Sequence, residues 1–181
     1  EMEFNRLLSS VISAYGEPEL GEAATEAKLE KRQGNINKKN YHLITSEKEI
    51  DEWINEAEEA GELAIDTETS SLDAHQADLV GISLSTKIGK ACYIPIGHKF
   101  KGCLKKENVI KKLKPLLEDK SVKKIGQNIK FDFIVLFKQG INMNSMEDTM
   151  LMSYVLDAGK NRHNMDTLSE IHLQHKTISF K

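Results

Sequence analysis

Two carboxylates lie two residues apart at the end of an apolar run, in Leu63-Ala64-Ile65-Asp66-Thr67-Glu68-Thr69. Residues i and i+2 of a strand share one face of a sheet, so Asp66 and Glu68 are expected to point to the same side. Neighbouring carboxylates repel each other unless a cation lies between them, and hard divalent ions such as Mg²⁺ prefer oxygen ligands. The pair is therefore a candidate metal site, although two acids at a strand end are also an ordinary surface feature.

A third carboxylate follows in the segment Gln127-Asn128-Ile129-Lys130-Phe131-Asp132. Asn128 and Asp132 are four residues apart and so share a face of a helix. Three carboxylates gathered in this way suit two-metal phosphodiester hydrolysis, in which one ion activates water and the other stabilises the leaving oxygen. Asn128 also suits the N-cap of that helix, and the two roles can coexist.

Other polar residues have structural interpretations. Asp148 precedes an apolar helical segment and is expected to cap it rather than to act as a fourth metal ligand. His172 and His175 are three residues apart on a predicted helix, where we expect solvated side chains rather than a metal site. The pair Arg162-His163 is expected to serve local structure.

Length and composition predict one domain with a short appendage, since the chain has 181 residues, of which 39% are hydrophobic. No run of about 18 apolar residues is present, so a membrane span is excluded, and the first residues do not form a signal peptide. Two cysteines are too few for a disulfide framework or a zinc motif. Cys92 lies in an apolar strand-like run and is expected to be a small core residue in a reducing cytosol.

Charge is unevenly spread along the chain. The net charge is −3, but residues 99–138 contain 12 lysines against 4 acids, so this stretch carries +8 and the remainder −11. A lysine-rich, solvated helix face is one interpretation. The other is a cationic flank that attracts phosphate beside an acidic metal site.

Apolar spacing predicts a helix over residues 4–15, and the polar stretch 17–40 reads as a linker. A globular part then begins with a strand at 41–44, followed by a helix that Thr45 or Ser46 can cap and Gly61 ends. Next come the Asp66 strand and a hairpin of residues 79–85 and 91–96. A strand at 122–125 and helices at 105–119, 129–139, 148–157 and around 168–173 complete a mixed α/β sheet.

Five blocks occur in order along this globular part. They are Asp66-Thr67-Glu68-Thr69 with Leu72-Asp73, Lys124 to Asp132, Asp148 to Leu151 with Ser153-Tyr154, Arg162-His163 with Met165-Asp166 and Leu168, and His175-Lys176-Thr177-Ile178. Together they strongly resemble the 3′–5′ proofreading exonuclease domain of bacterial DNA polymerase I. A single Asp-x-Glu is common in proteins, whereas five blocks in register are highly specific.

The resemblance implies a ribonuclease H-like fold, in which a mixed sheet of antiparallel hairpin strands and parallel strands is flanked by helices. It also implies two divalent metal ions, Mg²⁺ or Mn²⁺. In this family pattern Asp66 bridges both ions, Glu68 helps to hold the ion that activates water, and Asp132 acts at the second ion.

The resemblance further implies that 5′-mononucleotides are released from a single-stranded DNA 3′ end. Leu72 is then expected to wedge against the terminal base, Phe180 to stack on a base, and Asn128 to bond near the sugar-phosphate. Thr67 and Gln127 belong to the same expected set of DNA contacts. A core position is the alternative for Phe180.

By the same resemblance, residues 1–16 are the helical tail of a preceding 5′-nuclease region, 17–40 are a flexible linker, and 41–181 are an exonuclease domain incomplete at its C-terminus. The family's fourth carboxylate lies in a Tyr-x-x-x-Asp motif, and Tyr154 does not supply it because Ala158 lies four residues on. The parent is expected to be a monomeric, cytoplasmic enzyme that also carries a polymerase module. This stretch alone is expected to have impaired activity.

Two other functions fit the site. A ribonuclease D-like RNA 3′ exonuclease shares the Asp-x-Glu and Asn-x-x-x-Asp arrangement, but the block from His175 to Ile178 favours the polymerase. A catalytically inactive structural domain is the second alternative, and the retention of Asp66, Glu68 and Asp132 argues against it.

Overall fold

The structure is a computed structural model that describes residues 5–16, 41–99 and 101–178. The chain divides into two units, residues 1–32 and 33–181. In the first unit, residues 5–16 are described, and they contain the helix α1 (Asn5–Tyr15), which matches the predicted helix where the two can be compared. The linker predicted for residues 17–40 lies outside the described residues.

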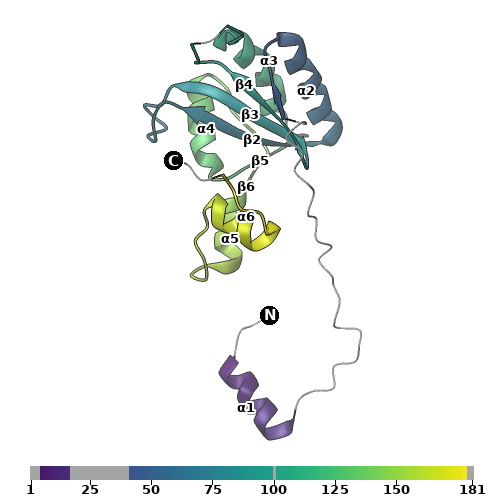
Figure 1. The fold of residues 1–181 in the computed structure, drawn as a ribbon, viewed down its shortest axis with the longest axis vertical. Helices are drawn as coiled ribbons and strands as arrows, with labels where there is room; N and C mark the ends of the chain where they lie inside the picture. Colours follow the sequence, from purple (N-terminus) through teal and green to yellow (C-terminus); the bar gives the residue numbers. More distant parts are fainter. Residues whose placement is uncertain (1–4, 17–40, 100, 179–181) are drawn as a thin grey trace. The chain divides into compact units, whose positions relative to one another are not determined.

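The second unit is built around a six-stranded mixed sheet flanked by helices (Figure 1). Its elements are β1 (Tyr41–Leu43), α2 (Glu47–Ala60), β2 (Glu62–Thr69), β3 (Leu79–Lys87), β4 (Lys90–Pro95), α3 (Lys106–Glu118), β5 (Lys123–Gly126), α4 (Ile129–Lys138), β6 (Met146–Asp148), α5 (Thr149–Asp157) and α6 (Met165–Leu173). The strand order is β1-β4-β3-β2-β5-β6, and β3 runs antiparallel to both of its neighbours. The predicted mixed sheet and its hairpin are confirmed. Strand β6 has no predicted counterpart, because two of its three residues, Glu147 and Asp148, are acids and show no apolar pattern.

Local signals set the ends of α2 as expected. Ser46 is the N-cap, and a capping box links its side chain to the backbone N–H of Glu49 and the Glu49 carboxylate to the backbone N–H of Ser46. Gly61 ends the helix in the left-handed conformation, which glycine adopts without steric cost. These two signals direct the chain straight into β2.

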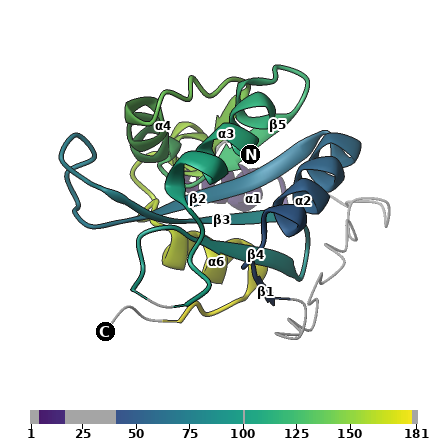
Figure 2. The same cartoon turned by 90° about the horizontal axis from the view of Figure 1, so that it is seen from above.

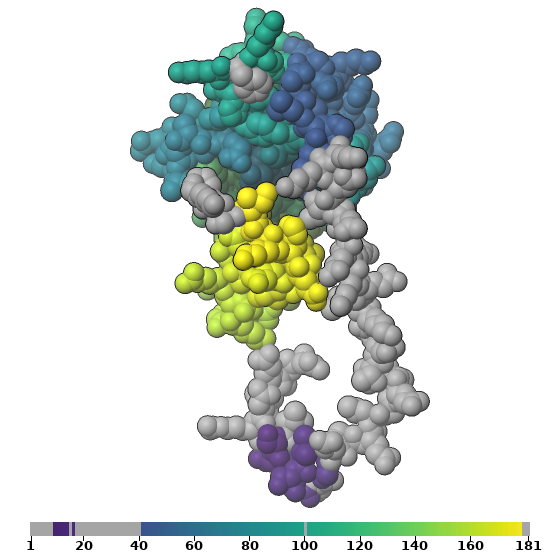
Figure 3. Space-filling model, viewed as in Figure 1, coloured from purple at the N-terminus to yellow at the C-terminus, as the bar shows by residue number. Residues whose placement is uncertain are grey.

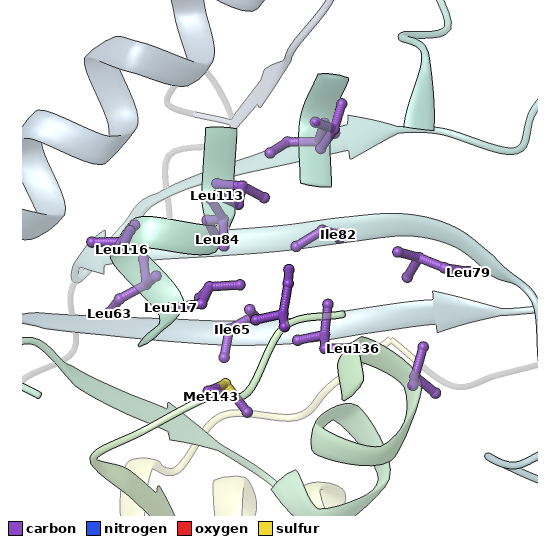
Figure 4. Packing of buried hydrophobic residues seen from close by; sticks show 14 of the residues in the cluster. Leu63, Ile65, Leu79, Ile82, Leu84, Leu113, Leu116, Leu117, Leu136 and Met143 are labelled. Carbon is purple, nitrogen blue, oxygen red and sulfur yellow. The ribbon is translucent and has the colours of Figure 1, made fainter. Parts of the chain in front are cut away.

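The hydrophobic core lies between the sheet and the helices α2, α3 and α4. Figure 2 shows α3 and α4 on one side of the β2–β3 pair and α6 on the other. Close up, Leu63 and Ile65 of β2 lie near Leu116 and Leu117 of α3, with Leu136 of α4 also in the cluster (Figure 4). Cys92 is buried in the same core, and burial raises the pKa of its thiol to about 12, as expected for an inert core residue.

The partners of β2 determine where a site can form. Its parallel ladder with β5 runs from Glu62 opposite Lys123 to Ala64 opposite Ile125. Its pairing with β3 extends five residues further, to Thr69, where the register shifts. The second half of β2 therefore has one paired edge and one edge open to α4. The C-terminal ends of β2, β5 and β6 lie at the same edge of the sheet, where parallel strands commonly bind ligands.

The lysine-rich stretch does not form one uniformly solvated face. Five of its twelve lysines are bound to other groups of the chain: Lys112 to Asp51, Lys114 to Glu118, Lys123 to Glu147, and Lys124 and Lys138 to backbone carbonyls. Lys124 is fully buried and donates to the carbonyls of Leu116 in the last turn of α3 and of Asp119 and Val122 after it. Burial lowers the pKa of its ammonium group.

The last two helices expose much of their apolar surface. Neither α5 nor α6 contains a buried residue, and both lie together as one yellow-green surface in Figure 3. Val155 and Leu156 of α5 and Leu173 of α6 are among their exposed side chains. Within the described ranges, no helix is both long and apolar enough to cross a membrane.

Candidate active site

A cavity of about 450 Å³ opens between the end of β2 and the start of α4. One wall comes from β2 and the loop after it, and the other comes from the β5–α4 turn and the first turn of α4. The lining residues are Asp66, Thr67, Glu68, Thr69, Ser70, Ser71, Leu72, Gln127, Asn128, Phe131 and Asp132. The three carboxylates predicted to act together thus line one cavity.

Asp132 is held at the base of the cavity by Thr67. The backbone N–H of Thr67 donates to Asp132 Oδ1 at 2.8 Å, and the Thr67 hydroxyl donates to the same oxygen at 2.6 Å. This N–H lies on the part of β2 beyond the ladder with β5, so a side chain from α4 takes the place of the missing strand partner. Asp132 is 2% exposed, and this burial raises the pKa of its carboxyl although the two Thr67 bonds oppose the shift.

Asp66 is partly buried and lies near both of the other carboxylates. Burial raises the pKa of the Asp66 carboxyl to about 6, and the nearby charges of Asp132 and Glu68 add to the rise. The negative charges of Asp132 and Glu68 thus both disfavour the ionised form of Asp66. A cation between them would relieve both the repulsion and the loss of hydration.

The donor set fits a hard divalent cation, because it consists of carboxylates alone and is exposed to a cavity. Among the described residues, no three side chains of His, Cys, Asp or Glu lie close enough together to enclose a metal ion. The carboxylates share the cavity without forming a closed coordination shell.

Asn128 occupies the N-cap position of α4 but does not cap it with its side chain. Its backbone is in the left-handed conformation, at φ 56° and ψ 42°, and its side chain accepts no capping hydrogen bond. Asparagine tolerates this conformation better than most residues. Gly126 makes the turn possible, because a Cβ there would lie 2.9 Å from Ile129. The prediction of a side-chain cap is wrong for Asn128, and its side chain instead lines the cavity.

Asp148 performs the capping that Asn128 does not. Its carboxylate accepts from the backbone N–H groups of Met150 and Leu151 at the start of α5, as predicted, and also from those of Asn128 and Ile129 at the start of α4. One carboxylate thus serves two helix N-termini. Asp148 is 8% exposed and is not among the residues that line the cavity.

Gln127 reaches the cavity wall, but its side-chain amide also bonds to the chain. Its Nε2 donates to the carbonyl of His163 at 2.8 Å, and its Oε1 accepts from the Thr149 hydroxyl at 2.6 Å. His163 itself forms a hydrogen bond with Ser153 and a ring contact with Tyr154. The local structural role expected for His163 is therefore present, and it anchors Gln127.

Leu72 is 99% exposed although it is a large apolar residue, and it lies at the edge of the cavity. Phe131 lines the cavity but was absent from the predicted set. The signal for Phe131 is its place directly before Asp132, in the first turn of the helix that begins after Asn128. Phe180, predicted to stack on a base, lies outside the described residues.

A family model described as 3′–5′ exonuclease matches residues 41–181. This chain belongs to the 3′–5′ exonuclease family of DNA polymerase I. The DNA polymerase I of Pseudomonas aeruginosa is 39% identical over 188 residues, which cover 100% of this chain and 20% of that protein. The chain therefore spans about a fifth of the length of that curated relative. The match confirms the family inferred from the five sequence blocks.

Solved structures show the same fold. Ribonuclease D of Escherichia coli, an exoribonuclease, has a TM-score of 0.62 and 18% identity over 77% of this chain and 35% of that one. Brucella melitensis NrnC with bound Mg²⁺ has a TM-score of 0.59 and 24% identity over 78% of this chain and 65% of that one. At these identities the likeness concerns the fold alone, and it confirms the ribonuclease H-like sheet.

Proposed function

We propose that this exonuclease domain removes nucleotides one at a time from a single-stranded DNA 3′ end and releases 5′-mononucleotides, with the help of two divalent metal ions, Mg²⁺ or Mn²⁺. The observation that carries the proposal is the meeting of Asp66, Glu68 and Asp132 at one cavity. Burial and, after it, the neighbouring charges of Asp132 and Glu68 raise the pKa of Asp66 to about 6, and a bound cation would offset both effects.

In this proposal Asp66 would help to hold both ions, Glu68 would help to hold the ion that activates water, and Asp132 would act at the second ion. When bound, such ions activate water near neutral pH and stabilise the leaving 3′ oxygen. Thr67 fixes the direction of the Asp132 carboxylate through its two hydrogen bonds. The Mg²⁺ in the NrnC neighbour supports the choice of metal.

The remaining cavity residues are proposed to hold the DNA end. Leu72 offers an exposed apolar side chain that can wedge beside the last base, and Asn128 offers an amide near the sugar-phosphate. Such contacts do not depend on base identity, which suits the editing of frayed ends. Thr67, Gln127 and Phe180 complete the proposed DNA contacts.

The sequence identity to DNA polymerase I supports the proposal that the same protein also contains a polymerase module. That module would be the physical partner of this domain. Because bacterial DNA polymerase I acts in DNA replication and repair, we propose that the protein works in the cytoplasm. We also propose that it is a monomer. The ribonuclease D neighbour keeps an RNA substrate as the second candidate. The sequence identities favour DNA, because the relatives at 39% to 45% identity are DNA polymerase I.

The test is the release of label from a 3′-labelled single-stranded oligonucleotide, as DNA and as RNA, with Mg²⁺, with Mn²⁺ and with EDTA. The chain is assayed alone and continued into the segment that follows it in a DNA polymerase I. Metal-dependent cleavage of DNA supports the proposal. Cleavage of RNA alone would favour the ribonuclease D-like function, and no cleavage by either form would leave an inactive structural domain.

A further inference from the structure

The loop between β2 and β3, residues 70–78, carries Leu72 and is tightly braced. The backbone N–H of Ser70 donates to the carbonyl of Asp78 at 3.0 Å, and the N–H of Asp78 returns a bond to Ser70 Oγ at 2.9 Å. Within the loop that these two hydrogen bonds close, the Asp73 carboxylate accepts from the backbone N–H of His75 and from the side-chain amide of Gln76. The loop is therefore a formed structure rather than a loose connection.

The loop is also attached to α4, the helix of the opposite cavity wall. Ala74 and Ala77 are buried in the core, at 8% and 1% exposure. The ammonium group of Lys138, in the last turn of α4, donates to the carbonyl of Ala77 at 2.8 Å and to that of Ala74 at 3.4 Å. Since the N–H of Ala77 bonds back to Asp73, residues 73–77 form one turn whose end Lys138 caps.

This attachment connects the two walls of the cavity. Asp132 and Phe131 lie in the first turn of α4, and Lys138 follows Asp132 by six residues, about 9 Å along the helix axis. Lys138 is not among the residues that line the cavity. Lys138 binds the loop that carries Leu72. It therefore influences the distance between Leu72 and the opposite cavity wall, which contains Asn128 and Asp132.

We infer that Lys138 is a positioning residue for the nucleic-acid end: it holds the Leu72 loop at a fixed distance from α4 and thereby sets the affinity of the cavity for a 3′-terminal nucleotide. The inference rests on the proposed exonuclease function. It assigns no chemistry to Lys138, so the chemical step should not depend on it.

The experiment compares Lys138→Met with Lys138→Arg, which keeps a cationic donor, and with Lys114→Met. Lys114 is the matched control, because it also donates to a backbone carbonyl, that of Gly140, and its partners Gly140 and Glu118 lie outside the loop. Lys138→Met is expected to raise the KM for single-stranded DNA about tenfold, the effect of one lost charge-assisted hydrogen bond, with kcat changed less than about twofold. Lys138→Arg should restore most of the KM, and Lys114→Met should leave it unchanged.

A double-mutant cycle tests the route of the effect. If Lys138 acts through Leu72, Lys138→Met added to Leu72→Ala should raise the KM no further. A full tenfold rise in that background, or an unchanged KM in Lys138→Met alone, would overturn the inference. Amide hydrogen exchange at Ala77 and Asp78 should accelerate in Lys138→Met but not in Lys114→Met, and equal exchange would also overturn it.

A binding assay distinguishes a failure of the positioning role from a failure of the proposed exonuclease function. If the unmodified chain cleaves no nucleic acid, the same variants are compared by fluorescence anisotropy with a 5′-fluorescein oligothymidylate in EDTA, where the Kd takes the place of the KM. A Kd that rises about tenfold in Lys138→Met and returns in Lys138→Arg supports the positioning role without any catalysis. An unchanged Kd contradicts it.

Discussion

Two carboxylates at the same edge of the sheet have opposite surroundings. Asp148, at the end of β6, accepts four backbone N–H groups and caps two helices. Asp66, near the end of β2, is partly buried and lies near two like charges, and burial first and these charges second raise its pKa. A carboxylate surrounded by donors is already satisfied, whereas one surrounded by acids lacks a cation. For these two residues, the surroundings distinguish the acid that caps helices from the acid that is proposed to hold a cation.

The largest effect expected from this comparison is on cleavage. Asp66→Ala removes the carboxylate that faces both of the others, so cleavage should fall by about three orders of magnitude or more, while the circular dichroism spectrum stays unchanged. Asp51→Ala, on the exposed face of α2, is the control and should keep full activity. Surviving activity in Asp66→Ala would mean that the two-metal assignment is wrong.

The next largest effect is on folding. Asp148→Ala leaves four backbone N–H groups without their acceptor, so the free energy of unfolding measured in urea should drop by about 3 kcal/mol. Asp51→Ala, which breaks one exposed ion pair, should cost less than about 1 kcal/mol. If Asp148→Ala instead abolished cleavage at unchanged stability, Asp148 would be the fourth metal ligand and the comparison would fail.

A smaller effect is expected at the support of Asp132. Thr67→Val removes one of two donors to Asp132 Oδ1 and keeps the shape of the side chain. Stability should fall by about 1 kcal/mol and cleavage should decrease, because the carboxylate loses its fixed direction. Thr86→Val removes a similar bond to Glu56, away from the cavity, and should lower stability without changing cleavage.

The smallest effect is a gain in stability. The pKa of Asp66 is raised from 3.8 to about 6, so the folded chain binds a proton that the unfolded chain releases, and ionisation destabilises the fold as pH rises between these values. In EDTA, Asp66→Asn should therefore be more stable than the unmodified chain above pH 6, by less than about 1 kcal/mol because the group is partly solvated. The difference should vanish below pH 4. Thermal melts at both pH values check it, and a gap that persists at low pH would assign the gain to another cause.

The sequence predicted the elements whose signals are local. The capping box at Ser46, the stop at Gly61 and the alternation of β3 and β4 each involve a few neighbouring residues, and all are present. The three carboxylates of the cavity were likewise identified, because the Asp-x-Glu and Asn-x-x-x-Asp spacings place their side chains on shared faces.

The features that were missed depend on contacts between distant residues. Strand β6 exists through its pairing with β5, the Asn128 cap is taken over by Asp148 from twenty residues away, and Lys124 is buried under carbonyls that follow α3. A lysine count cannot distinguish such a buried cation from a solvated one. Pairing, capping by a remote side chain and burial are properties of the folded chain and leave no local pattern.

Both edges of the sheet are short. The edge strands β1 and β6 contain three residues each, whereas the central strands β2 and β3 contain eight and nine. An exposed strand edge is the usual template on which a second chain adds and aggregates. Here an incoming strand would find few free backbone groups in register, so growth of the sheet from chain to chain should be unfavourable. The long strands β2 and β3, of which β2 lines the cavity, lie in the middle of the sheet, away from that hazard.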